Sequence, residues 1–354
     1  MTTPFLLYGS YGYTGALIAE QAVKRGMHAI LSGRDAIRLQ SQADTLGLEY
    51  HPISVDDPGA LNAALKEVPL VLNCAGPFVR TYTPIVDACL RMGKHYLDIT
   101  GEIPVFEALA ARDNDARKAQ VMLLPGVGFD VVPSDCLAAH LKRRLPNATH
   151  LTLAINMSGG GTSRGTILSA LERLPDQGAL RKDGRLVQVP LLGKTREFDF
   201  GRSPRTAMNI PWGDVSTAYY STGIPNIETY MVFPKSVRRM GRFLGALIGL
   251  TAQPVVQRLL RQAVMRSAPG PSAEARRLSR SRLWGEASDD QGQHVVTRMD
   301  TPNGYDLTVE TALAAVERVL AGDFKPGYQT PSLAYGADFI LEFEGVSRKD
   351  LELS

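Results

Sequence analysis

Residues 4–20 read PFLLYGSYGYTGALIAE, and this stretch decides the fold of the first part of the chain. Its apolar start, residues 4–8, is short and does not alternate with polar residues, as expected of a strand buried on both faces of a parallel sheet. Gly9, Gly12 and Gly15 follow at a G-x-x-G-x-x-G spacing, and helical periodicity comes next. Such glycines let a pyrophosphate approach the backbone, while the amides and dipole of the helix N-terminus bind its charge. The stretch predicts a dinucleotide site; the alternative is a purely structural glycine turn.

The end of the second expected strand, residues 28–32, indicates which dinucleotide binds. An enzyme that selects NAD usually carries an acid here for the ribose 2′-hydroxyl, but this chain has none before Asp35. It offers the hydroxyl of Ser32 and the guanidinium of Arg34 instead, which suit a 2′-phosphate, and Arg38 lies one helical turn further on. We therefore predict NADP as the cofactor. The alternative is that Arg34 is only a solvated residue after a strand.

The composition is that of an ordinary globular protein, with 354 residues, 44% of them hydrophobic and 21% charged. This length is enough for two domains. The start of the chain has no basic region ahead of its apolar run, and three cysteines indicate a reduced compartment, so a cytoplasmic location is expected. The six histidines are scattered and no Cys/His/Asp cluster has metal-ligand spacing, which predicts no metal site.

The charge is distributed unevenly. Residues 235–282 contain eleven Lys and Arg against one acid, Glu274, although the whole chain carries a net charge of only +3. Inside this basic segment, residues 243–256 are almost entirely apolar but too short to span a bilayer. The segment either makes a peripheral contact with a membrane surface or is a packed helix, or a homodimer contact, with a solvated basic rim. No nucleic-acid partner is expected.

Up to about residue 145, strand-like runs alternate with helical patterns at the spacing of βα units. The expected strands lie near residues 4–8, 28–32, 48–54, 69–74, 95–99 and 120–125. Six such units predict an α/β fold with a Rossmann-like, doubly wound parallel sheet, whose ligand lies beyond the carboxyl ends of the strands.

The later part of the chain has longer strand-like segments and a turn-rich connection at residues 289–293 that is typical of a hairpin. The expected strands are 151–157, 228–233, 279–288 and 294–300. They predict a second, α+β domain containing an antiparallel sheet. The expected domains are an NADP-binding domain at 1–135, a substrate or oligomerisation domain at 136–302, and a C-terminal part at 303–354 whose helix and strand pack back on the first domain.

The fourth strand ends in VLNCAGPF, residues 71–78. Small residues at a strand end let the backbone pass beside the pyrophosphate and the nicotinamide ribose. Cys74 has no histidine near it in sequence, and a buried thiol in such a place is more often a small apolar filler than a nucleophile.

The ends of the fifth and sixth strands also carry candidate residues. Asp98 and Glu102 are predicted at the ligand-facing end of the fifth strand, where an acid is costly unless it is hydrogen-bonded or functional. Both interpretations stay open, because Asp98 could instead tie down the following loop. The sixth strand runs into PGVGFDVVPSD, residues 125–135, and Gly126 and Gly128 suggest close approach to the flat nicotinamide ring.

Most predicted cofactor contacts come from the glycine turn and the strand ends. They are Gly9, Ser10, Tyr11, Gly12, Tyr13, Thr14, Gly15, Ser32, Arg34, Arg38, Asp56, Cys74, Ala75, Gly76, Pro77, Gly126 and Gly128.

Four motifs occur in order at fitting separations: the glycine turn, N-C-x-G-P-[FY], C-x-x-x-G-x-H-Y-x-D-x-x-G-E and P-G-x-G-F-D-x-x-P-S-D. With them the chain resembles the saccharopine dehydrogenase-like oxidoreductases, and within these the branch that contains bacterial trans-acting enoyl reductases. The resemblance implies an NADP-type Rossmann domain, a second α+β domain inserted before the last helices, and hydride transfer. The chain departs from the family at Thr83-Pro84, where Gly-Glu is more frequent.

Three functions fit the sequence. The first is an NADPH-dependent reductase that acts on the carbon–carbon double bond of a hydrophobic or lipid-linked, acyl-type substrate, with Tyr82, Asp98 and Asp130 as candidate catalytic acids. The second is hydride transfer to the C=N bond of an amino-acid imine, as in saccharopine formation. Saccharopine carries several carboxylates and should meet clustered Arg and Lys, whereas the segments expected near the nicotinamide are mostly apolar and small. The third is an NADP(H)-binding regulatory or membrane-peripheral protein without turnover.

Overall fold

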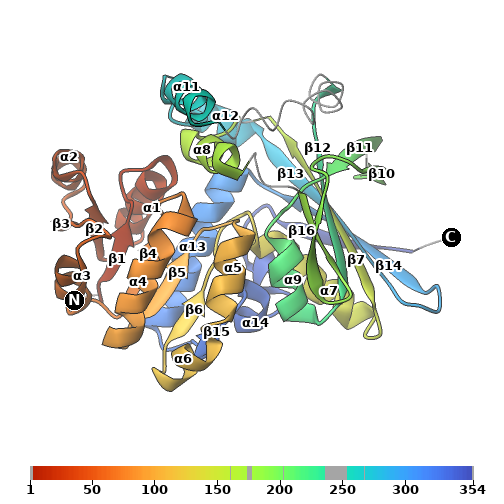
Figure 1. Ribbon diagram of the computed structural model, residues 1–354, viewed down its shortest axis with the longest axis horizontal. Helices are drawn as coiled ribbons and strands as arrows, with labels where there is room; N and C mark the ends of the chain where they lie inside the picture. Colours follow the sequence, from red (N-terminus) through yellow and green to blue (C-terminus); the bar gives the residue numbers. More distant parts are fainter. Residues whose placement is uncertain are drawn as a thin grey trace. The chain divides into compact units, whose positions relative to one another are not determined.

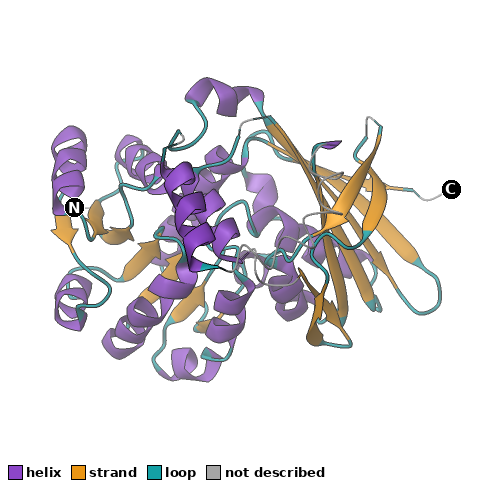
Figure 2. Cartoon of the chain, turned by 45° about the horizontal axis from the view of Figure 1, so that its top comes forward, coloured by secondary structure: helices purple, strands orange, loops and turns teal. Residues whose placement is uncertain are grey.

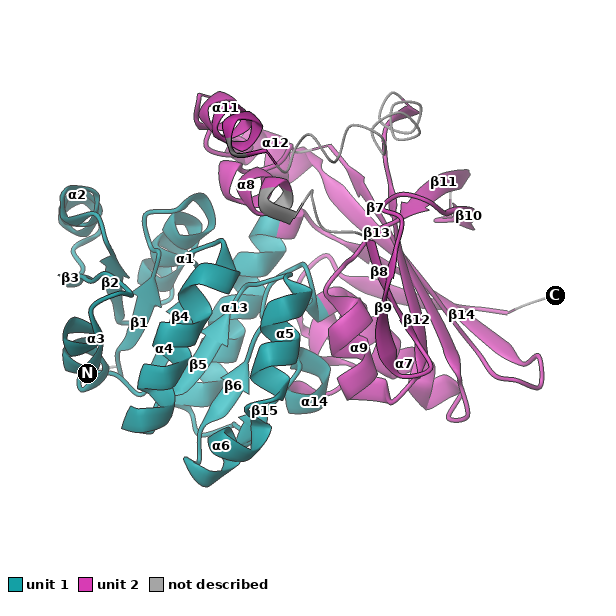
Figure 3. Cartoon of the chain, viewed as in Figure 1, with its two compact units in different colours: residues 1–132, 305–334 teal, residues 133–304, 335–354 magenta. Residues whose placement is uncertain are grey.

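The structure is a computed structural model and describes residues 3–159, 161–173, 178–201, 203–235, 253–266 and 268–352 (Figure 1). The chain forms two compact units, which Figure 3 colours separately. Unit 1 comprises residues 1–132 and 305–334, and unit 2 comprises residues 133–304 and 335–354.

Among the described residues, unit 1 contains a sheet of seven strands, all of them parallel. In spatial order these are β15 (Gly327–Tyr328), β6 (Met122–Leu124), β5 (His95–Asp98), β4 (Leu70–Asn73), β1 (Phe5–Tyr8), β2 (Ala29–Gly33) and β3 (Tyr50–Pro52). The predicted Rossmann-like parallel sheet is confirmed. The short strand β15 is an addition to the six strands predicted.

The central strand β1 is buried along its whole length, as its apolar sequence requires. Leu7 pairs in register with Leu31 of β2 on one side and with Leu72 of β4 on the other. The chain first builds outward from β1 through β2 and β3, and then restarts at β4 on the opposite side. The carboxyl ends of β1 and β4 therefore form the topological switch point, where open α/β sheets bind their ligands.

The helices of unit 1 lie on both faces of the sheet, because right-handed crossovers on the two sides of β1 place their helices on opposite faces. They are α1 (Tyr13–Lys24), α2 (Ala36–Leu46), α3 (Pro58–Leu65), α4 (Phe78–Met92), α5 (Ile103–Ala110), α6 (Asp113–Lys118) and α13 (Gly304–Leu320). Helices α3, α4 and α5 adjoin one another along one face of the sheet (Figure 1).

Unit 2 is built on a second sheet, of nine strands among the described residues (Figure 2). Its main path runs β10 (Thr195–Asp199), β11 (Pro204–Asn209), β12 (Asn226–Val232), β7 (His150–Ser158), β13 (Arg280–Ser288), β14 (His294–Thr301) and β16 (Ser347–Leu351). Off this path, β8 (Gly178–Lys182) pairs with β12 and with β9 (Arg185–Val189). The helical elements are α7 (Val132–Arg144), α8 (Arg164–Arg173), α9 (Asp214–Thr222), α11 (Pro254–Met265), α12 (Ala273–Leu278) and the 3-10 turn η1 (Phe339–Glu342). The short helix α14 (Pro331–Tyr335) belongs to unit 1 except for its last residue.

The predicted hairpin of β13 and β14 is confirmed, with the N–H of Asp289 donating to the carbonyl of Gln293 at 3.0 Å. The sheet is mixed rather than wholly antiparallel, because β7 and β12 run parallel. A long connection between these two strands contains helices, and such connections allow parallel pairing where a tight turn does not. Phe198, Tyr230 and Trp284 form the aromatic centre of a core cluster on this sheet.

The C-terminal part of the chain divides between the two units. Helix α13 and strand β15 belong to unit 1, but residues 335–354 belong to unit 2. The prediction that all of 303–354 packs on the first domain is therefore wrong for β16, which pairs antiparallel with the open edge of β14. Asp350 of β16 also accepts a 2.8 Å hydrogen bond from Nε2 of His140 on α7. The last strand thus completes the second sheet.

Candidate functional site

The glycine turn lies at the switch point of unit 1. Gly9 has φ +80° and passes so close to the end of β4 that a Cβ on it would lie 2.8 Å from the backbone nitrogen of Ala75. A Cβ on Gly15 would lie 2.4 Å from the carbonyl oxygen of Gly9. These two positions exclude any side chain, because the turn folds tightly back on itself and against the neighbouring strand end.

The N-terminus of α1 is open to an anion. Gly12 occupies its N-cap position without a side-chain cap, and its first turn contains no acid. The next two helices differ, since Asp35 caps α2 and Asp57 caps α3 through backbone N–H groups. The N-terminus of α1, with its positive dipole end and no side-chain cap, therefore suits a pyrophosphate beyond β1.

The N-terminus of α4, by contrast, is already occupied by a carboxylate of the protein. The two carboxylate oxygens of Glu102 accept hydrogen bonds from the N–H groups of Phe78 and Val79, at 3.0 and 2.9 Å. Glu102 is 4% exposed, and it carries the negative charge that this helix terminus favours. Of the two helices that begin at the switch point, α1 is therefore the one left to bind a phosphate.

A cluster beside β2 surrounds the place where the 2′ side of an adenosine ribose is expected. The guanidinium of Arg38 stacks on the ring of Tyr11 at 4.5 Å and donates a 2.9 Å hydrogen bond to the carbonyl of that residue. The hydroxyl of Tyr11 accepts a 3.3 Å hydrogen bond from the N–H of Asp35. A Cβ on Gly33 would lie 2.6 Å from the Tyr11 ring, so the ring needs a glycine there. Arg34 is exposed and forms no ion pair with the residues that the structure describes.

The hydroxyl groups of two predicted cofactor contacts, Ser32 and Ser10, bind other parts of the protein. Ser32 has no exposed surface, and its hydroxyl donates to the carbonyl of His51 at 2.9 Å. The structure therefore gives this hydroxyl a partner inside the protein, and its contact with the 2′-phosphate stays a prediction. Ser10 is also fully buried, and its hydroxyl donates to the side chain of Gln42 at 2.8 Å. Sequence reasoning missed Gln42, since only its place on α2 brings it to the glycine turn.

A buried polar network ties together the carboxyl ends of β4, β5 and β6. The amide nitrogen of Asn73 donates to the hydroxyl of Tyr96 at 3.2 Å, and that hydroxyl donates to Asp98 at 2.8 Å. The other carboxylate oxygen of Asp98 accepts from the N–H groups of Thr100 and Gly126, both at 2.9 Å. Burial raises the pKa of Asp98 to about 7, opposed by these two backbone hydrogen bonds. With no exposed surface, Asp98 joins two loops to the sheet and cannot touch a substrate.

Gly126 and Gly128 are buried and face protein rather than open space. A Cβ on Gly126 would lie 2.9 Å from the side chain of Val131, and one on Gly128 would lie 2.9 Å from that of Thr308. The close approach of the nicotinamide to these glycines stays a prediction. They are needed because the loop after β6 packs closely against its own following residues and against α13.

The other candidate catalytic residues lie nearer the surface. Tyr82 is half-buried on α4, and its hydroxyl has no hydrogen-bond partner among the described residues. Asp130 is half-buried, and a Cβ on Gly101 would lie 2.9 Å from its Oδ2. Burial raises the pKa of the Cys74 thiol, which leaves it protonated and unsuited to act as a nucleophile.

Most remaining predicted cofactor contacts line the rim of the switch point with at least partial exposure. They are Gly12, Tyr13, Thr14, Ala75, Gly76 and Pro77. Asp56 is exposed after β3, where its carboxylate accepts a 3.3 Å hydrogen bond from Ser54. Among the residues that the structure describes, no group of three or more His, Cys, Asp or Glu is arranged to hold a metal ion.

Comparison with known proteins agrees with this geometry. Residues 5–124 match the model of the saccharopine dehydrogenase NADP binding domain. A Mycobacterium tuberculosis protein provisionally named a trans-acting enoyl reductase is 28% identical over 95% of this chain and 94% of its own length. The rat saccharopine dehydrogenase-like oxidoreductase is 29% identical over 54% of this chain and 51% of its own. Apo saccharopine dehydrogenase (L-Glu forming) from Saccharomyces cerevisiae shares the fold, with a TM-score of 0.68 and 13% identity over 99% of this chain and 100% of its own.

Proposed function

We propose that the chain is a saccharopine dehydrogenase-like, NADP-dependent oxidoreductase that uses NADPH to reduce a carbon–carbon double bond in a hydrophobic, acyl-type substrate. The observation that carries this choice of substrate is the length of the similarity to the mycobacterial protein named as an enoyl reductase, which includes residues of both units. The yeast saccharopine dehydrogenase supports the fold alone at 13% identity.

The residues around the switch point suit NADPH. The open N-terminus of α1 would hold the pyrophosphate, and the lack of a side chain at Gly12 would let it approach the backbone there. Arg38, oriented by the ring of Tyr11, and the exposed Arg34 would hold the 2′-phosphate. When bound, NADPH supplies the hydride for one carbon of the double bond.

The other carbon requires a proton, and we assign its donation to the hydroxyl of Tyr82. A phenol carries its proton at neutral pH and can donate it. Tyr82 lies on the first turns of α4, just after the strand end 74–77, and its side chain is partly exposed. Its hydroxyl forms no hydrogen bond with the residues that the structure describes. Asp98 is excluded as donor by its complete burial, and Asp130, as a half-buried carboxylate, is the second candidate.

The test is NADPH oxidation, followed by absorbance, with trans-2-enoyl thioesters of increasing chain length. We expect turnover that rises with chain length, and Tyr82→Phe should lower kcat roughly 100-fold or more while leaving NADPH affinity unchanged. Tyr50→Phe, on the edge strand β3, is the matched control and should behave as the natural chain.

Two results would contradict this proposal. Oxidation of NADPH only with a keto acid or aldehyde together with an amino acid would favour an imine as substrate. Full activity of the Tyr82→Phe variant would remove Tyr82 as donor and direct attention to Asp130.

A further inference from the structure

Helix α11 of unit 2 is attached to the rest of that unit through one face. It lies against α8, and Nε2 of Gln257 donates a 3.1 Å hydrogen bond to the carbonyl of Leu171 (Figure 1). Val256, Leu260 and Val264 recur at helical spacing and are half-buried on this side. The helix is therefore amphipathic, and its packed side contacts other residues of unit 2.

The opposite face exposes large apolar side chains. Val255, Leu259 and Met265 are 69%, 60% and 57% exposed. Arg258 and Arg266 are also exposed and, at 100° per residue, fall on the same side of the helix. A single exposed apolar residue needs no explanation, but three that share a helix face with arginines form a surface of mixed apolar and cationic character.

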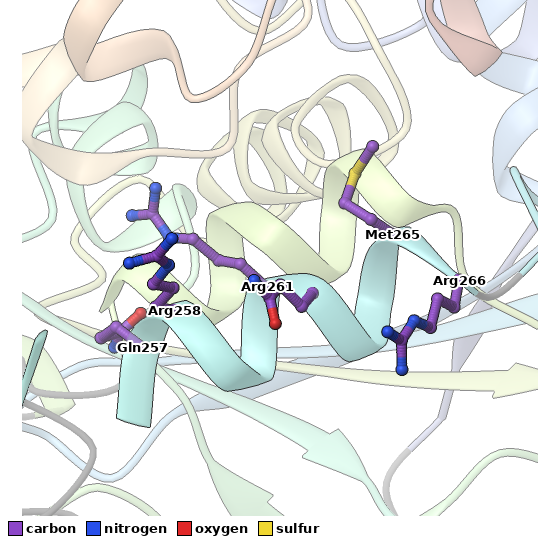
Figure 4. Close-up of a pocket in the computed structure, with 6 residues that line it drawn as sticks. Gln257, Arg258, Arg261, Met265 and Arg266 are labelled. Atoms are coloured by element: carbon purple, nitrogen blue, oxygen red, sulfur yellow. The ribbon is translucent and has the colours of Figure 1, made fainter. Parts of the chain in front are cut away.

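The cations of this face have no acidic partner among the residues that the structure describes. Neither Arg258 nor Arg266 forms an ion pair with any residue in the described part of the chain. Arginines of the sheet behave differently, as with Arg282, which contacts Asp300 at 3.0 Å. Helix α11 itself contains no acid. Figure 4 shows residues of an open groove along it, whose lining consists of Gln257, Arg258, Arg261, Gln262, Met265 and Arg266.

We propose that α11 binds an anionic lipid surface through the face formed by Val255, Arg258, Leu259, Met265 and Arg266. The apolar side chains would enter the acyl boundary while the guanidinium groups contact lipid phosphates, the arrangement of a helix lying in the membrane plane. The positive charge selects an anionic surface. None of the described helices is long and apolar enough to cross a membrane. This inference does not depend on the substrate or on turnover.

The experiment is co-sedimentation of the full chain with vesicles of phosphatidylglycerol or of phosphatidylcholine. We expect binding to the anionic vesicles only, and weaker binding as NaCl rises from about 50 to about 300 mM, because the Debye length shortens over that range. The double variant Arg258→Gln, Arg266→Gln should bind about 30-fold more weakly, since each basic residue near an anionic surface contributes roughly fivefold. Leu259→Ser should weaken binding about tenfold through the apolar contribution.

Matched controls make the assignment specific to α11. Arg185→Gln and Leu186→Ser change the same residue types at exposed positions of β9 and should leave vesicle binding unchanged. NADPH affinity, measured by fluorescence, should be the same in every variant, which shows that unit 1 remains folded.

Several outcomes would overturn the proposal. These are no sedimentation with either vesicle, equal sedimentation with both, or anionic binding that the α11 variants do not weaken. A concentration-dependent dimer that the same variants dissociate would identify a second copy of the chain as the occupant instead. Competition by inorganic phosphate at constant ionic strength would indicate a site for free anions.

Discussion

Oε1 of Glu102 accepts a 3.0 Å hydrogen bond from the backbone N–H of Phe78, 24 positions earlier in the chain. Through this bond and its partner to Val79, a nearly fully buried carboxylate at the start of α5 closes the N-terminus of α4. The two helices that begin at the switch point therefore differ: the N-terminus of α4 is capped by the Glu102 carboxylate, whereas that of α1 has no side-chain cap. The protein itself thus selects which helix terminus is available for a phosphate.

Replacing Glu102 should therefore destabilise unit 1. Glu102→Gln removes the charge and one of two acceptor oxygens, and we expect the free energy of unfolding to fall by about 1–3 kcal/mol, the usual cost of losing a charge-assisted hydrogen bond in a buried place. Urea denaturation followed by circular dichroism measures the change. Glu107→Gln, on the same helix, is the control, and equal stability of the Glu102 variant and the natural chain would show that the cap is dispensable.

Substitutions at two glycines of the turn should affect NADPH binding and folding differently. A Cβ on Gly12 would meet only the carbonyl of Gly9, at 3.2 Å, so Gly12→Val should fold while its side chain occupies the pyrophosphate space. A Cβ on Gly15 would lie 2.4 Å from the same carbonyl, so Gly15→Val should also lower the melting temperature. Isothermal titration with NADPH and thermal denaturation test both. Normal NADPH binding by Gly12→Val would place the cofactor site elsewhere.

Selectivity for NADPH over NADH should depend on the stacked pair of Tyr11 and Arg38 together with Arg34. Arg38→Ala and Arg34→Ala should each weaken NADPH by roughly tenfold or more, from the loss of about 1.5–3 kcal/mol per charge-assisted contact, and leave NADH unchanged. Titrating each variant with both cofactors gives the ratio of the two Kd values. An equal loss for NADH and NADPH would indicate structural damage instead.

The ring of Tyr11 should act through Arg38. Tyr11→Ala removes the surface on which the guanidinium lies, and we expect the ratio of Kd values to shift in the same direction as in Arg38→Ala. Tyr11→Phe keeps the ring and should keep most of the selectivity. If the alanine variant retained full selectivity, Arg38 would be positioned without the ring.

The buried Asp98 should give stability a distinctive pH dependence. Its folded pKa, about 7, lies above the ordinary value of 3.8, so the folded state binds more protons than the unfolded state between these limits. The contribution of Asp98 to the free energy of unfolding therefore decreases as pH rises from about 4 to 7, and is constant above that. In Asp98→Asn this decrease of the free energy of unfolding with rising pH should disappear. Denaturation of both proteins at a series of pH values measures it, and parallel curves would contradict the assignment.

The sequence alone determined the features that depend on neighbours along the chain. Residues 4–20 specify a buried strand, a glycine turn and a helix because the pattern of apolar residues and the space needed at Gly9 and Gly15 are local properties. The β13–β14 hairpin was predictable for the same reason, since its strands and turn-rich connection are contiguous.

The tertiary structure decided where the polar side chains point. The cap formed by Glu102 on α4, the burial of the Ser32 hydroxyl against His51, and the packing of Gly128 on Thr308 each join segments distant in the sequence. The same holds for β16, whose place was set by the free hydrogen-bonding edge of β14. Periodicity places a residue at a strand end, but only the strands and helices packed beside it decide whether its side chain meets solvent, a ligand or another part of the protein.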